Sequence, residues 1–175
     1  MRRVILLLLA ALFPVFLAGC EGEGGYSQAV GAEAVKADLP LSATDWPWWR
    51  GPNRSGIAPE NQKPPVTWNE KKNVVWKFAV PGRGHGSPTI VGRRVFLATA
   101  DRSSQTQSVL CLDRDSGRRL WQTIVQRGPL ETRGNKKSTQ ASCTPACDGT
   151  RVYVNFLHNG SIFTTALDLN GQKIW

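Results

Sequence analysis

Short apolar runs separated by turn-forming residues fill the second half of the chain. Gly92 and Gly149 stand just before two of these runs, where a glycine can turn the chain from one strand into the next. No segment shows the 3.6-residue apolar period of an amphipathic helix. The pattern therefore predicts an all-β fold of short antiparallel strands. The runs with the highest content of β-forming and apolar residues are 95–99, 108–112, 152–156 and 163–167.

The runs belong to a repeat. Residues 87–97 and 144–154 carry proline, glycine, arginine, valine, an aromatic and an aliphatic residue in the same order. Residues 110–121 and 166–175 then match in an aspartate, a glycine and a tryptophan four residues after the glycine. The aspartate can hold the N–H groups of a tight turn, and the glycine can take the positive φ that the turn needs. Four short antiparallel strands in each repeat are typical of the blades of a β-propeller.

The strand count predicts a partial β-propeller with about two blades. Residues 87–125 give one whole blade, and residues 144–175 give three strands and the start of a fourth. Residues 74–80 are predicted to form a fourth-type strand with no first three strands before it. Because each blade buries its faces only against its neighbours, two blades leave the ring open. We therefore expect a fragment of a longer product, with a ring assembled from several copies as the alternative.

The repeat resembles the quinoprotein, or PQQ-like, β-propeller repeat, in which a Leu-Asp turn precedes a glycine and a tryptophan. Quinoprotein alcohol dehydrogenases and BamB-like outer-membrane lipoproteins share this repeat, and the resemblance covers about residues 45–175. It implies that the repeat tryptophans pack between neighbouring blades and that the aspartates and glycines shape the turns. The structural residues that it implies are Trp76, Trp121, Trp175, Asp113, Gly117, Asp168 and Gly171.

A lead-in rich in tryptophan and proline, residues 45–73, precedes the repeats at residues 74–175. Trp46, Trp48 and Trp49 lie in this lead-in and outside the repeat. We expect them to cover or plug the propeller, with stacking on a ligand as the alternative.

The first residues have the features of an export signal. A short basic start precedes an apolar run at residues 4–17, which is shorter than the roughly 20 residues of a membrane-spanning helix. The run ends in Leu-Ala-Gly-Cys, which resembles a bacterial lipobox. Residues 1–19 are therefore predicted to be a lipoprotein signal peptide, cleaved between Gly19 and Cys20, with a lipid attached to Cys20. The alternatives are a plain signal peptide with a coincidental cysteine and an uncleaved anchor.

Residues 20–44 carry glycine, alanine, glutamate and serine without hydrophobic periodicity, which is typical of a flexible linker. The sequence thus predicts a lipid-anchored protein of the bacterial cell envelope that faces the periplasm or the exterior. The outer membrane is one destination for such a protein. The membrane is an expected partner through the N-terminal lipid.

The formal net charge of +9 raises the question of a nucleic-acid partner. The basic residues are scattered over polar turns, where charge keeps a β-protein soluble. No nucleic-acid-binding motif accompanies them. We therefore expect a solvated basic surface and no nucleic-acid partner.

Residues that often carry chemistry form no catalytic constellation. His85 and His158 fall in different repeats. The glycine-rich connection at residues 81–86 lacks the strand-to-helix context of a phosphate loop, so we expect a structural loop, with anion binding as the alternative. Cys143 and Cys147 would stand about 13 Å apart in an extended chain. A disulfide allows only about 7 Å between Cα atoms, so we expect none there.

The sequence favours a non-catalytic scaffold for binding or protein interaction. The resemblance leaves two alternatives, a dehydrogenase dependent on PQQ and Ca²⁺ and a BamB-like outer-membrane assembly factor. The dehydrogenases stack the quinone on a disulfide of adjacent cysteines, which this chain lacks, and no cofactor or metal is otherwise predicted. Residues 126–142 form a longer loop than residues 81–86, and loops of this kind often carry function. With a solvated connector as the alternative, its candidate contact residues are Arg133, Lys136, Lys137 and Gln140.

Overall fold

The structure is a computed structural model that describes residues 40–130, 135 and 137–175. The chain divides into two units, Met1–Val35 and Lys36–Trp175, and all the described residues belong to the second. Within them, no helix has the length and apolar character needed to cross a membrane. The predictions that lie outside the described residues are the signal peptide, the linker up to residue 39, Gly19, Cys20, Arg133 and Lys136.

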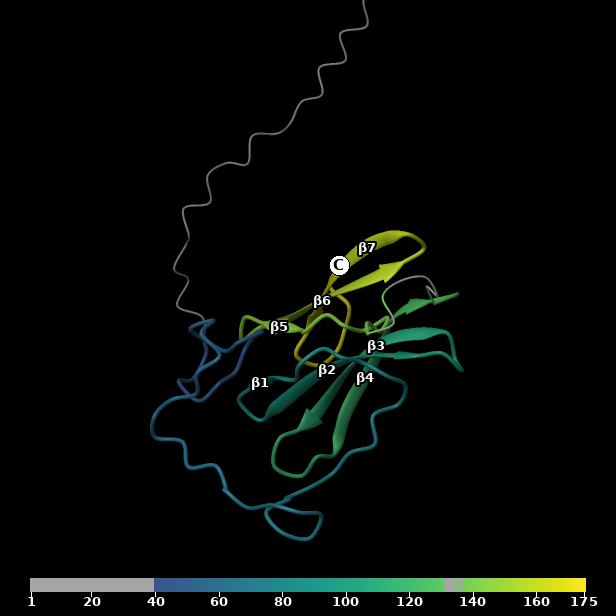
Figure 1. Cartoon of the computed structure of the whole chain (residues 1–175). Helices are drawn as coiled ribbons and strands as arrows, with labels where there is room; N and C mark the ends of the chain where they lie inside the picture. The colour runs from purple at the N-terminus through teal and green to yellow at the C-terminus, as the bar shows by residue number, and fades with distance from the viewer. Residues whose placement is uncertain (1–39, 131–134, 136) are drawn as a thin grey trace, which may run out of the picture. The chain divides into compact units, whose positions relative to one another are not determined.

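Four antiparallel strands form the first sheet, in the order β1-β2-β3-β4 (Figure 1). Gly92 takes a φ of +55° in the turn between the first two strands, as a tight turn requires. The sheet confirms the whole blade that the repeat predicts. Its strands are β1 (Thr89–Val91), β2 (Arg94–Asp101), β3 (Thr106–Asp113) and β4 (Arg119–Arg127).

Three antiparallel strands form the second sheet, in the order β5-β6-β7. They are β5 (Ala146–Cys147), β6 (Arg151–His158) and β7 (Ser161–Asp168). The last residues then return along β7, because Ile174 donates to Ala166 O at 2.8 Å and Ala166 donates to Trp175 O at 3.0 Å. This pairing is the start of the fourth strand that the sequence predicts.

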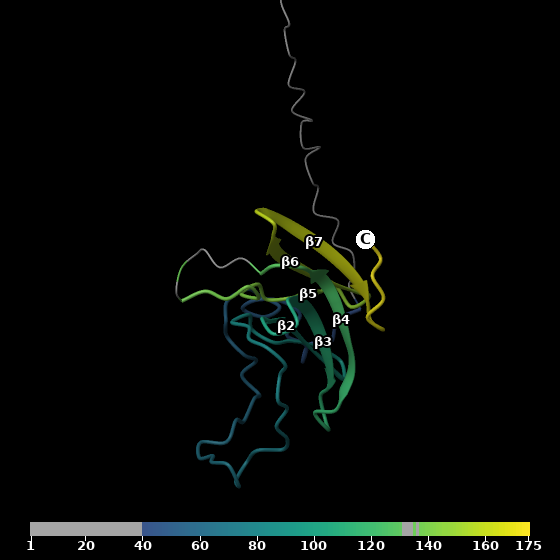
Figure 2. The same ribbon diagram turned by 90° about the vertical axis from the view of Figure 1, so that its right-hand side faces the viewer.

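The two sheets pack face to face through one apolar core. Phe96 and Val109 of the first sheet meet Val152 and Phe156 of the second, and each is at most 2% exposed. Figure 2 shows the hairpin of β6 and β7 beside the first sheet. Burying a side chain of this size contributes roughly 1.5–3 kcal/mol, so the interface between blades accounts for much of the stability.

Trp121 of β4 ties the first sheet to the second. Its indole packs against Gly171, and its Nε1 donates to Leu169 O at 3.0 Å. Gly171 takes a φ of +85°, which glycine adopts without strain. Trp175 is 55% exposed, and its ring lies 6.2 Å from the ring of Tyr153.

The turns after β3 and β7 are organised by their aspartates. Asp113 Oδ1 accepts the hydroxyl of Ser116 at 2.7 Å and its N–H at 2.9 Å. These bonds, the hydroxyl first, hold the pKa of Asp113 below its usual value. Asp168 Oδ1 accepts the N–H of Asn170 at 2.9 Å in the equivalent turn.

Residues 74–80 do not form the predicted strand, and this prediction is wrong. A strand needs a neighbour for its backbone hydrogen bonds, and within the described residues none lies along this segment. The segment keeps an alternating pattern, with Trp76 half-buried and Val75 87% exposed. Trp76 packs against Gly117 and donates its Nε1 to Arg114 O at 2.8 Å, in the same way as Trp121 packs on the next turn.

The lead-in joins one edge strand of each sheet, β1 and β5. Trp46 exchanges two backbone hydrogen bonds with Ile90 of β1, at 2.7 and 2.9 Å. Pro47 O accepts the N–H of Cys147 in β5 at 2.8 Å. Asp45 is 4% exposed, and its carboxylate accepts the N–H of Gly92 at 2.8 Å. The start of the lead-in is therefore fixed across β1 and β5.

Candidate functional site

Two connections meet at the end of the sheets where β2 turns into β3 and β6 turns into β7, and we call this end the rim. One is the glycine-rich segment at residues 81–86, and the other is the loop between β4 and β5, of which the structure describes residues 128–130, 135 and 137–145. Ala141 O accepts the N–H groups of His85 and Gly86 at 3.1 and 3.3 Å, so the two connections are bonded to each other.

Alternate glycines let the first connection lie between β2 and the loop. A Cβ at Gly82 would overlap the carbonyl of Ala100, and one at Gly86 would overlap the carbonyl of Cys143. Gly84 is equally confined by Ala98 O. The Gly-x-Gly-x-Gly pattern is therefore explained by the close approach of three backbones, and the structural-loop prediction for this connection accords with its geometry.

Arg83 and His85 alternate with the glycines and are exposed at the rim. The Arg83 guanidinium can only donate, so His85 Nε2 accepts from Arg83 Nη2 at 3.4 Å. The Nδ1–H of a neutral imidazole then donates to Lys137 O at 3.0 Å.

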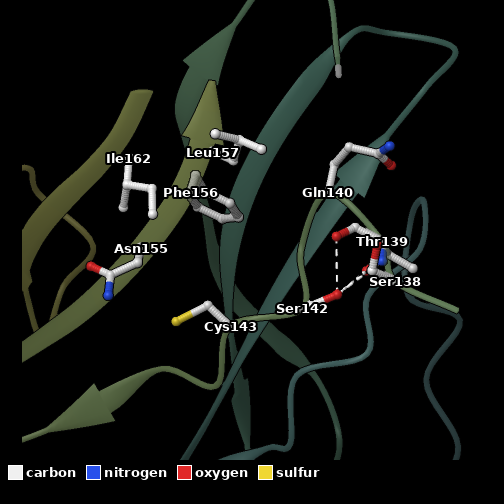
Figure 3. Close-up of a pocket in the computed structure, with 9 residues that line it drawn as sticks. All are labelled: Ser138, Thr139, Gln140, Ser142, Cys143, Asn155, Phe156, Leu157 and Ile162. Carbon is white, nitrogen blue, oxygen red and sulfur yellow. Dashed lines mark hydrogen bonds between the residues drawn. The ribbon is translucent and has the colours of Figure 1, made fainter. Parts of the chain in front are cut away.

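The apolar rim pocket is a hollow of about 250 Å³ between the loop and the second sheet (Figure 3). Phe156, Leu157 and Ile162 form its apolar wall. The opposite side is lined by Ser138, Thr139, Gln140, Ser142 and Cys143. Ser142 Oγ donates to Thr139 O at 3.0 Å and accepts the N–H of Thr139 at 2.9 Å. These local bonds hold the loop in shape, so the pocket is formed before any ligand arrives.

The basic rim pocket is a hollow of about 310 Å³ on the other side of the same loop segment. Arg83, Arg102 and Asp101 line it together with residues 138–140. The hydroxyl of Ser103 donates to Asp101 at 2.7 Å and is the main cause that holds the pKa of this carboxyl below its usual value. The pocket thus presents two cations and one carboxylate that is already hydrogen-bonded to its own turn.

A buried glutamine supports both rim pockets. Gln107 of β3 is fully buried, and its Nε2 donates to Gln140 O at 2.7 Å and to Leu157 O at 3.1 Å. Its Oε1 has no hydrogen-bond partner within the part of the chain that the structure describes. Sequence reasoning missed this residue, because it lies in the polar stretch of residues 103–108, ahead of the apolar residues of β3.

The predicted contact residues are only partly brought to the site. Gln140 lines both rim pockets. Lys137 is exposed beside them, and its carbonyl oxygen accepts a hydrogen bond from Nδ1 of the His85 ring. The rest of the site comes from residues that the sequence did not single out. The walls of the two rim pockets combine loop residues with residues of other segments that are distant in the sequence.

The cysteines of the described residues are free thiols. Cys111 and Cys147 are buried between the sheets, and burial raises their pKa values to about 12 and about 11. Cys143 is half-buried in the wall of the apolar rim pocket, and its Sγ lies 3.4 Å from Thr144 O. Cys143 and Cys147 are not joined, in line with the strand geometry argued from the sequence.

The described residues do not fit a PQQ and Ca²⁺ site. Residues 40–130, 135 and 137–175 contain no cluster of three or more His, Cys, Asp or Glu side chains that could hold a metal ion. The sequence also has no adjacent cysteines on which a quinone could stack. We therefore derive no chemistry through this cofactor.

The repeat matches a known family. The family model described as outer membrane protein assembly factor BamB, a PQQ-type repeat family, matches residues 61–175, which is more than half of the chain. The chain belongs to this family. The comparison with curated proteins finds no match. The BamB-type match includes both sheets and both rim pockets, whereas residues 45–60 of the lead-in precede it.

Proposed function

We propose that this protein is a lipid-anchored, non-catalytic scaffold of the cell envelope whose rim binds an extended segment of a partner protein. The observation that carries the proposal is the placement of residues 138–140 between an apolar and a basic pocket at the same rim. A peptide crossing this segment would meet both pockets in succession.

The chemistry of the pockets suggests what the peptide carries. Leu157 and Ile162, which are 45% and 73% exposed, offer an apolar surface for one aliphatic or aromatic side chain of the peptide. Arg83 and Arg102 offer charge to an acidic side chain beside it. We therefore expect a partner segment in which an apolar residue lies next to aspartate or glutamate.

Two further arguments support a protein partner in the envelope. The family description names the assembly of outer-membrane proteins. It therefore favours a BamB-like role, in which the chain binds other proteins, over the conversion of a small molecule. The lipobox ending at Cys20 favours an anchor that keeps the scaffold beside such partners.

Selection of peptides from a random displayed library tests the proposal. Selected peptides should share an apolar residue beside an acidic one, and Ile162→Asp should weaken their binding about tenfold by placing charge in the apolar rim pocket. Ile124→Asp is the matched control, because Ile124 is also an exposed isoleucine in a strand but lies outside both pockets. Equal losses in both variants, or peptides with no shared pattern, would exclude the rim as the binding site.

A further inference from the structure

A tight turn in the lead-in brings two tryptophans and two arginines together. Gly51 donates its N–H to Trp48 O at 3.0 Å and closes a four-residue turn. Arg54 donates its N–H to Gly51 O at 3.0 Å and closes a second turn at once. The Cζ atom of Arg50 lies 5.5 Å from the centre of the Trp49 ring, and that of Arg54 lies 5.7 Å from the centre of the Trp48 ring. Each indole therefore has one guanidinium within cation–π distance.

Both arginines have an unusual backbone conformation. The φ of Arg50 is +67° and that of Arg54 is +54°, in the left-handed region that glycine and asparagine normally fill. Arginine has no local preference for this region, so the conformation is unfavourable and must be held by its surroundings. Arg50 Nη2 donates to Ser55 O at 2.9 Å, and this bond helps to hold the guanidinium at Trp49.

The turn is also fixed to the propeller. Gly51 is buried against the ring of Trp46, and a Cβ at Gly51 would come within 2.6 Å of that ring. Trp46 is in turn bonded to Ile90 of β1. The tryptophans and arginines are therefore presented by a rigid support, which lowers the entropic cost of binding a ligand.

The four side chains line a hollow of about 520 Å³ together with Ala146 of β5, and we call it the Trp–Arg hollow. It is mostly apolar and open to solvent, and Trp49 is 64% exposed beside it. Trp48 Nε1 is buried and has no hydrogen-bond partner among the described residues. An exposed indole with cations beside it offers a flat apolar face and a site for negative charge.

We propose that the Trp–Arg hollow binds an acidic polysaccharide. The apolar C–H face of a sugar ring stacks on an indole, and a guanidinium binds a uronate or sulfate group through paired hydrogen bonds. The hollow is too open to enclose a small ligand, since small-molecule sites bury most of their ligand's surface. A polymer that crosses the surface and is held at one or two sugar units fits this geometry.

A single-stranded nucleic acid is the other anionic polymer that stacks on tryptophan. Its sites use a basic groove that follows the backbone over about 4–16 nucleotides, with a series of stacked bases. Here two adjacent tryptophans and two arginines within seven residues form one compact hollow. The geometry therefore favours a sugar acid, and nucleic acid becomes an outcome of the test.

This inference is independent of the rim. The tryptophans and arginines of the hollow lie in residues 48–54, before the segment that matches the family, and the hollow shares no residue with either rim pocket. A protein with a functional rim and no affinity for glycans would exclude this inference alone.

Calorimetric titration of the full chain tests the proposal. The probes are polygalacturonate oligomers, sulfated dextran, unmodified dextran as the neutral control, and a single-stranded oligonucleotide. We expect binding to one or both acidic glycans and none to dextran. Trp49→Ala and Arg54→Ala should each weaken the binding about tenfold, as removal of a stacking face or a charge-assisted contact does.

Two controls separate the hollow from general effects. Trp68→Ala removes a tryptophan of the same lead-in that is 75% exposed and lies outside the hollow, and it should change binding less than twofold. Trp49→Phe keeps an aromatic face and should retain most of the affinity lost in Trp49→Ala. Equal losses in Trp49→Ala and Trp68→Ala would overturn the proposal. So would the absence of acidic-glycan binding, equal binding of dextran, or tighter binding of the oligonucleotide.

Discussion

Trp121 packs directly on Gly171, the turn glycine of the neighbouring blade. A Cβ placed on Gly171 would lie 2.6 Å from Cδ2 of the indole, so the ring occupies the space that any other side chain would need. Trp76 has the same relationship with Gly117 one blade earlier. The tryptophan of one repeat thus packs on the turn glycine of the next repeat. We call this contact between a tryptophan and a glycine the joint.

Substitution of this glycine should weaken the joint. Gly171→Ala would force the Trp121 ring away and would place a Cβ at a φ of +85°. Overpacking and left-handed strain together should cost about 2–4 kcal/mol in the free energy of unfolding, measured by urea denaturation. Gly160→Ala is the control, because Gly160 has a φ of +73° and open space around its Cβ position. This substitution therefore adds the left-handed backbone strain without any overpacking. Equal losses at both positions would show that packing on Trp121 contributes nothing.

The same joint shows how much of the fold was predictable. The spacing of Asp113, Gly117 and Trp121 predicted the turn, the next strand and the architecture. This was possible because a tight turn and a strand depend mainly on residues that are close together in the sequence. The strand predicted at residues 74–80 was wrong, because a strand exists only beside a partner and sequence pattern carries no information about the partner. Residues 74–80 alternate between exposed and half-buried side chains as a strand does, but no strand of the described residues pairs with them.

The candidate site was far less predictable than the fold. Gln140 was singled out from the sequence, but of the two pockets that it lines, one depends on Ile162 of β7 and the other on a connection before β1. Nothing in the sequence placed the buried amide of Gln107 behind this loop. The left-handed conformation of Arg50 was equally hidden, since arginine is not a residue that signals positive φ.

Removal of the buried amide should loosen the rim. Gln107→Leu would leave Gln140 O and Leu157 O without their donor, at a cost of about 1–3 kcal/mol. Hydrogen exchange should become faster in residues 138–143. Gln122→Leu is the control, since Gln122 is a half-buried glutamine of β4 whose Oε1 accepts from Arg119 Nη1 at 3.0 Å, and it should change stability by less than about 0.5 kcal/mol. Unchanged exchange in Gln107→Leu would show that the loop does not depend on this residue.

The pKa values of Asp101 and Asp113 should lie below the usual value of an aspartate. Since the folded pKa of Asp113 is below its ordinary value of 3.8, its contribution to stability is present above about pH 4 and is lost as pH falls through the folded pKa. Ser116→Ala removes the main cause and should raise the pKa of Asp113, measured by NMR titration of the carboxyl carbons. Ser103→Ala should raise the pKa of Asp101 instead. A variant that shifts both carboxyls equally would contradict this local origin.

The anchor predicted from the lipobox rests on one residue. Cells that express the protein with a labelled fatty acid should incorporate the label, and Cys20→Ala should abolish incorporation and release the protein from the membrane fraction. Cys143→Ala removes a different cysteine and should leave the label in place. Label retained in Cys20→Ala would show that Cys20 is not the acylated residue.

The thiols of the described residues should differ sharply in reactivity. Cys111 and Cys147 are buried and have pKa values of about 12 and about 11, so at pH 8 only about one molecule in a thousand or fewer carries either thiolate. Cys143 is half-buried in the wall of the apolar rim pocket and should be alkylated first by iodoacetamide, as followed by peptide mass spectrometry. Unfolding in urea should make all three thiols react at similar rates. Early alkylation of Cys111 in the folded protein would mean that the interface between the two sheets opens to solvent, because Cys111 is otherwise sealed within the shared core.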